Sequence, residues 1–140
     1  MVKRFLLAVV AVFIAWSLLD FIIHGLVLKS TYEATASLWR PMEQMKMGVM
    51  HVATAVYALA FVAIYAALVT PKSMAASLKY GTLFGVATGV SMGFGSYSVM
   101  PIPLHLAVVW CVGALVEMIV AGAIVGAVIK EVASGTDNRT

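Results

Sequence analysis

The sequence places ionisable side chains inside segments that are otherwise apolar. Asp20 and His24 stand four residues apart in the run S-L-L-D-F-I-I-H-G-L. On a helix this spacing puts both side chains on one face, where a carboxylate can orient an imidazole and raise its basicity. Such a pair suits a metal ligand backed by an acid, or a hydrogen-bond relay that moves protons. It would equally suit a polar contact that only joins two helices.

Three histidines are the candidate ligands of a metal or haem. His24 ends the first apolar segment, His51 begins the second and His105 begins the fourth, so the expected topology brings all three to the outer side. Histidines with carboxylates suit zinc or another divalent metal, histidines with methionines suit copper, and two histidines on facing helices can hold haem. No spacing in the sequence is diagnostic of one of these, so the cofactor stays open.

Four polar or sulfur-bearing residues could support such a site, namely Asp20, Glu43, Met47 and Glu117. Glu43 and Met47 precede His51 at four-residue intervals, which places them on one helix face. Glu117 lies at the centre of the last apolar segment, about 20 Å along the helix axis from His105. An ionisable residue at that depth is costly and is read as functional. Because of its distance, we expect Glu117 to influence His24 less than Asp20 does.

The composition predicts that lipid is the solvent for these residues. Apolar residues make up 63% of the 140-residue chain and charged residues 11%, against roughly 45–50% and about 25% in soluble domains. Four segments reach the length of about 20 residues that a span needs: about 5–28, 47–69, 78–100 and 104–129. The expected fold is all-α, a single transmembrane domain over residues 1–140 built as a four-helix bundle, with a polar tail at 131–140.

Charge at the ends of the segments predicts the orientation. With the N-terminus inside, six basic residues are cytoplasmic (Lys3, Arg4, Lys72, Lys79, Lys130 and Arg139) and three are outside (Lys29, Arg40 and Lys46). This asymmetry favours an inner-membrane protein with both termini in the cytoplasm. In the first outer loop, Tyr32, Trp39 and Arg40 suit a short helix anchored in the membrane interface.

A glycine stripe marks the third apolar segment. Gly81, Gly85, Gly89 and Gly93 recur every four residues, so they follow one face of a helix. Small residues at this spacing let two helix backbones approach closely. The pattern predicts that the stripe is buried against another helix.

The stretch D-F-I-I-H-G-L-V-L-K-S-T-Y-E-A-T-A-S-L-W-R-P-M-E-Q-M, Asp20–Met45, carries a family resemblance. It resembles the signature region of small bacterial four-span proteins that have no assigned activity. The resemblance covers under a fifth of the chain and implies an inner-membrane protein without transferring a function. It directs attention to the residues Asp20, His24, Tyr32, Trp39, Arg40 and Pro41.

Three functional classes remain. The sequence contains no enzyme signature of the hydrolase, P-loop or dinucleotide-binding kind, and no basic cluster that would grip nucleic acid. The favoured class is a small membrane protein that acts by binding, as an accessory subunit of a larger complex or as a self-oligomer, through a polar site near its outer face. The alternatives are a redox protein that carries haem or copper, and a proton- or ion-coupled transporter.

Overall fold

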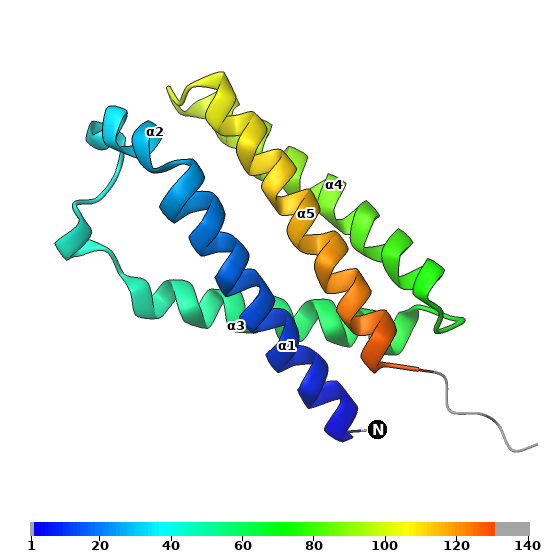
Figure 1. The fold of residues 1–140 in the computed structure, drawn as a ribbon. Coiled ribbons are helices and arrows are strands. Elements are labelled where there is room, and N and C mark those ends of the chain that lie inside the picture. The colour runs from blue at the N-terminus through cyan, green and yellow to red at the C-terminus, as the bar shows by residue number, and fades with distance from the viewer. Residues whose placement is uncertain (1, 131–140) are drawn as a thin grey trace, which may run out of the picture.

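The computed structural model describes residues 2–130, and over this range it contains helices and no strands. The expected polar tail at 131–140 lies outside the described residues. The helical elements, shown in Figure 1, are α1 (Val2–Asp20), the π-helical η1 (Phe21–Val27), α2 (Lys29–Ala34), the 3-10 turns η2 (Ala36–Leu38) and η3 (Met42–Gln44), α3 (Met47–Leu68), α4 (Met74–Val99) and α5 (Leu104–Val128).

Within residues 2–130, three helices are long and apolar enough to cross a membrane. They are the continuous α1–η1 helix Val2–Val27, α3 (Met47–Leu68) and α5 (Leu104–Val128). Their bounds agree within three residues with the first, second and fourth predicted spans. Helix α4 has 26 residues, which is long enough to span, but its glycines, serines and threonines make it less apolar than the other three.

Proline and capping residues explain where the long helices end. Pro101 and Pro103 separate α4 from α5, because proline cannot continue a helix and restricts the residue before it. Ser73 precedes α4, and its Oγ accepts a hydrogen bond from the backbone N–H of Ala76 at 3.1 Å. Lys72 donates to the carbonyl oxygen of Tyr65 at 3.0 Å, so its charge meets the negative end of the α3 dipole.

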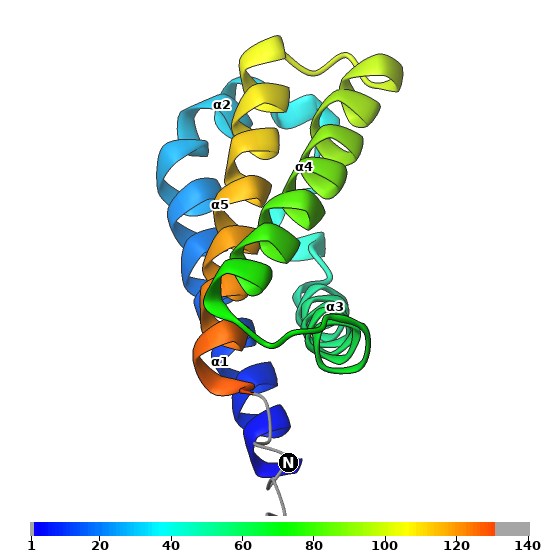
Figure 2. The ribbon, with the colours of Figure 1, turned by 90° about the vertical axis from the view of Figure 1, so that its right-hand side faces the viewer.

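The long helices do not all run in one direction. Helices α1, α5 and α4 lie side by side, whereas α3 crosses them steeply, and Figure 2 looks down the α3 axis while the other three lie across the view. Helix α3 therefore departs from the near-parallel arrangement of a four-helix bundle. The most extensive contact between helices is the one between α4 and α5.

Only the second half of α3 packs against the other helices. Ala58, Phe61, Val62 and Tyr65 are buried, while residues 47–56 are exposed apart from Thr54, which is half-buried. Tyr80 of α4 donates its hydroxyl proton to the Phe61 carbonyl at 2.8 Å. The first half of α3 thus stands apart from the packed core.

The glycine stripe is buried between α4 and α5, as predicted. All four of its members are buried residues of α4. A Cβ atom added to Gly89 would stand 2.5 Å from the carbonyl oxygen of Cys111, and one added to Gly85 would stand 2.9 Å from the Cα of Leu115. The two backbones approach so closely that no larger residue fits without a shift.

A second, smaller core holds the first long loop against the end of α5. Its fully buried members are Leu28, Ile102, Leu106 and Ala107, and the rings of Tyr32, Trp39 and Trp110 pack around them. Trp39 lies edge-on to Tyr32, with ring centroids 5.4 Å apart. Two of the three expected interface anchors, Tyr32 and Trp39, therefore pack against the protein, whereas Arg40 is exposed.

Candidate functional site

A cavity of about 160 Å³, mostly apolar with a few ionisable side chains, lies among α1, η1, α3, α4 and α5. Its lining includes three ionisable side chains, Asp20, His24 and Glu117, and three aromatic ones, Trp16, Tyr57 and Trp110. Pockets for drug-sized ligands run to about 300–1,000 Å³, so this cavity is suited to a smaller molecule. Asp20 and Glu117 are far apart in the sequence, and the packing of α1 against α5 brings them together.

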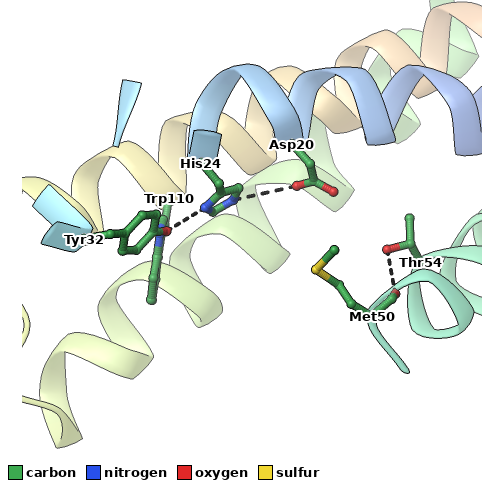
Figure 3. Close-up of polar contacts among 6 residues, drawn as sticks. All are labelled: Asp20, His24, Tyr32, Met50, Thr54 and Trp110. Carbon is green, nitrogen blue, oxygen red and sulfur yellow. Dashed lines mark hydrogen bonds and ion pairs between the residues drawn. The ribbon is translucent and has the colours of Figure 1, made fainter. Parts of the chain in front are cut away.

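A directed chain of polar contacts leads to Asp20 at the cavity wall. The indole N–H of Trp110 donates to the Tyr32 hydroxyl at 2.8 Å, and that hydroxyl is 2.6 Å from Nδ1 of His24. On the other side of the ring, Nε2 of His24 is 3.7 Å from Oδ1 of Asp20. Figure 3 shows the imidazole between Tyr32 and Asp20. The expected proximity of Asp20 and His24 is confirmed.

The chain of contacts favours one tautomer of His24. An indole N–H can only donate, so the Tyr32 oxygen accepts from Trp110, and the same hydroxyl can either donate to Nδ1 of His24 or accept from it. Donation by Tyr32 gives the phenolic proton a partner and leaves the proton of the neutral ring on Nε2, facing Asp20. At 3.7 Å this last contact is longer than a hydrogen bond. A small rearrangement, or a water or ligand atom, would close it.

Glu117 faces the same cavity from α5 with part of its hydrogen-bonding capacity unused. Its Oε1 is buried without a hydrogen-bond partner in the described residues. Its backbone carbonyl accepts a hydrogen bond from the indole of Trp16 at 2.9 Å, which ties α1 to α5 at this depth. A buried, unpaired carboxyl oxygen costs stability, and such groups call for a specific explanation.

Aromatic rings lie beside the carboxyl groups in the lining. Trp16 and Tyr57 stack on one another, with ring centroids 5.1 Å apart and an interplanar angle of 28°. Trp16 is only 2% exposed and is held by its bond to α5, so this ring is fixed in place. Ring faces carry negative charge density and attract cations.

The segment that carries His24 is a π-helix. The N–H of Leu28 bonds to the carbonyl of Ile23 at 2.9 Å, which is the wider i→i+5 pattern. Gly25, a weak helix former, lies within this segment. π-helical turns inside α-helices are rare and are often found at functional sites, and here the turn places His24 between Asp20 and Tyr32.

The cavity reaches the surface beside the first half of α3. Met92 of α4, which lines the cavity, is 52% exposed. Thr54 of α3 lines the opposite side, and Figure 3 shows Met50 and Thr54 across from Asp20. The steep crossing of α3 leaves its exposed first half beside this part of the cavity.

The structure does not gather the expected metal ligands. Within residues 2–130, no group of three or more His, Cys, Asp or Glu side chains is placed to share a metal ion. His51 is exposed near the start of α3, and His105 is exposed with its Nε2 3.0 Å from the Thr31 hydroxyl. Glu43 and Met47 are exposed as well and do not line the cavity. Of the seven residues predicted to form or support the metal site, only Asp20, His24 and Glu117 meet.

Sequence reasoning missed Trp16, Thr54 and Trp110. A usable signal exists for the two tryptophans, because membrane proteins favour Trp at the two interfaces and both lie well inside apolar segments. A buried indole N–H also needs a partner, which Trp16 finds in Glu117 and Trp110 finds in Tyr32. Thr54 carries no comparable signal.

No protein family, characterised protein or solved structure matches this chain. The resemblance of residues 20–45 to small bacterial membrane proteins therefore stays a prediction.

Proposed function

We propose that this chain is a small multi-pass membrane protein that binds a small polar ligand in the cavity among α1, α3 and α5. The observation that carries the proposal is that Asp20, His24 and Glu117 line one cavity inside an apolar fold. Ionisable residues within membrane segments are costly, and they mark binding sites and ion pathways. Oε1 of Glu117 is buried and makes no hydrogen bond within the described residues, so it is available to a ligand.

We further propose four crossings, with α4 as the fourth span, in a bacterial inner membrane. Helix α4 is as long as the other spans and lies along α5. The start of α1, the α3–α4 turn and the end of α5 lie toward one end of the molecule (Figure 1). These segments carry most of the basic residues, which favours a cytoplasmic location for that end. The cavity then opens in the outer half of the membrane.

The glycine stripe also bears on protein partners. Its pattern favoured self-association or a place in a larger complex, but the glycines of α4 pack against α5 of the same chain. We therefore keep binding as the activity and assign it to the cavity. In this proposal a protein partner or a second copy would be a neighbour in the membrane and would not form the binding site.

The test measures the thermal unfolding of Glu117→Met in mild detergent. If the carboxyl is kept for a ligand, replacing it with an apolar side chain of similar size removes an unpartnered buried oxygen. The variant should then be more stable than the parent by about 1–3 kcal/mol. Glu43→Met changes the same kind of side chain at an exposed position outside the cavity and should leave the stability nearly unchanged.

The opposite result would assign Glu117 to helix packing. A Glu117→Met protein that unfolds at a clearly lower temperature would show that the carboxyl is bonded in the folded state. The binding proposal would then lose its central residue.

The cavity also favours a second candidate, proton- or ion-coupled transport. Asp20, His24 and Glu117 form a group of titratable side chains at one place, and such groups occur in proton relays. Ion flux into liposomes should then fall strongly in Glu117→Gln. Flux equal to that of the parent protein would remove this candidate.

A further inference from the structure

We propose that the ligand of the cavity is a small organic cation, an ammonium or guanidinium compound. Its charge would lie between the carboxyl groups of Asp20 and Glu117 and against the rings of Trp16 and Tyr57. This inference rests on the proposed binding function and adds the chemical class of the ligand.

The first argument is charge. The cavity is lined by two carboxyl groups and no lysine or arginine of the described chain. His24 is the only basic side chain in the lining, and the Tyr32 hydroxyl lies 2.6 Å from its Nδ1. A doubly protonated imidazolium would have to donate to Tyr32 from Nδ1, which would deprive the phenolic proton of this acceptor. The contacts of His24 thus favour the neutral ring. Two carboxyl groups at one site readily share a proton, and a monovalent cation from outside would balance the charge that is left.

The aromatic side chains of the lining also favour a cation. Trp16 and Tyr57 stack with a small interplanar angle of 28°, and both line the cavity together with Trp110. Organic ammonium groups are recognised by aromatic rings, with tryptophan the strongest. A carboxyl group beside aromatic rings offers a cation both an ionic and a dispersive contact. An anion would meet two acids, with His24 as the one basic side chain of the lining.

The third argument separates an organic cation from a metal ion. Hard cations such as Ca²⁺ are bound by six to eight oxygen atoms, whereas the lining is mostly aromatic and apolar. Residues 2–130 hold no group of three or more acidic, His or Cys side chains placed for a metal. A volume of about 160 Å³ is much more than a bare ion needs and suits a compound of a few carbon atoms.

The experiment uses the full chain in mild detergent and reads tryptophan fluorescence, since two of its three tryptophans line the cavity. The probes are methylammonium, tetramethylammonium, choline and guanidinium. The matched control is 3,3-dimethyl-1-butanol, which has the shape of choline without the charge. Acetate serves as the anion. We expect a saturable change with at least one cation and none with the alcohol or acetate.

Variants locate the response. Asp20→Asn and Glu117→Gln keep the size of the side chain and remove its charge, so each should weaken cation binding by roughly tenfold to a hundredfold. Glu43→Gln, an exposed carboxyl outside the cavity, should bind as the parent does. Thermal unfolding of each variant checks that it is folded.

The outcomes separate this inference from the proposed function. The proposed ligand class would be wrong if none of the four cations gave a saturable response. It would also be wrong if choline and its neutral analogue gave equal responses. Cation binding that survives in both Asp20→Asn and Glu117→Gln overturns it as well. Binding of the alcohol or acetate that is lost in Asp20→Asn would keep the cavity as a binding site and discard only the ligand class.

Discussion

At the scale of single residues, the informative feature is the order of donors around His24. Trp110 donates to the Tyr32 hydroxyl, which lies 2.6 Å from Nδ1 of His24. The first direction is fixed, because an indole only donates, and the second is favoured because it gives the phenolic proton an acceptor. In that arrangement the neutral ring turns its Nε2–H toward Asp20. Tyr32, predicted as an interface anchor, also contacts the imidazole at the cavity wall.

The Tyr32→Phe substitution tests this order. Without the hydroxyl, Nδ1 of His24 loses its donor and the Trp110 N–H loses its acceptor. We expect the ¹⁵N NMR shifts of the His24 ring to move toward a mixture of tautomers, and stability to fall by about 1–3 kcal/mol. Tyr97→Phe removes a hydroxyl from an exposed tyrosine and should change neither. Unaltered His24 shifts in Tyr32→Phe would show that another group selects the tautomer.

Tyr32 also predicts a dependence of stability on high pH. Burial raises the pKa of its phenol above the ordinary 10.0, the hydrogen bond from Trp110 opposes this, and the charge of Asp20 adds to it. Because the pKa in the folded state exceeds that in the unfolded state, the contribution of Tyr32 is complete below pH 10.0 and is lost as pH rises through the folded-state value. Unfolding curves of the parent and Tyr32→Phe should therefore converge at high pH. Curves that stay equally far apart above that range would contradict the assignment.

At the scale of elements, α4 and α5 form the closest pair, and the glycine stripe is the reason. Without side chains on that face, the α4 backbone reaches the carbonyl oxygens of α5. Close approach of this kind supplies dispersion energy where lipid removes the hydrophobic driving force between helices. The pair then forms the wall against which α1 packs to complete the cavity.

Two glycines of α4 make a matched test of this contact. A methyl group on Gly89 would meet the Cys111 backbone at 2.5 Å, whereas one on Gly95 would meet nothing within 4 Å. Gly89→Ala should cost about 1–3 kcal/mol through overpacking, while Gly95→Ala should be neutral or slightly stabilising because alanine favours helix. Thermal unfolding in detergent measures both. Equal effects would mean that the α4–α5 distance is larger than described.

The crossing of α3 predicts where water reaches the cavity. Thr54 lines the cavity beside the exposed half of α3. A cysteine introduced by Thr54→Cys, with the native thiol removed by Cys111→Ala, should react with a water-soluble maleimide at least several-fold faster than one introduced by Ala58→Cys. Ala58 is fully buried one turn further along the helix. Similar rates at both positions would argue against an entrance there.

At the scale of the whole molecule, the number of crossings decides where the cavity opens. If α4 spans, the turns at Lys72 and Pro101 lie on opposite sides of the membrane. A phosphatase active only outside the cytoplasm should therefore work when fused after Gln44 or Pro101 and fail after Lys72 or Lys130. Activity that is the same after Lys72 and Pro101 would show that α4 does not cross.

Much of this architecture follows from local sequence. Spans appear as apolar runs of about 20 residues because lipid cannot satisfy backbone polar groups outside a helix. Gly81–Gly93 predicts a buried helix face from its period alone, and Asp20 and His24 are neighbours because the helix repeat places them so. Pro101 and Pro103 separate two helices by their covalent structure. Each of these is a property of residues close together in the chain.

The tertiary structure alone decided which polar residues share a site. The helix rise predicts only the distance of Glu117 from His105 in the same helix. The contact of α1 with α5 is what brings Glu117 and His24 to one cavity. His51 fits the sequence pattern equally well and is exposed, because α3 crosses the other helices steeply and its first half stands free. The crossing angle of two apolar helices depends on how their side chains interlock, which no spacing within one helix records.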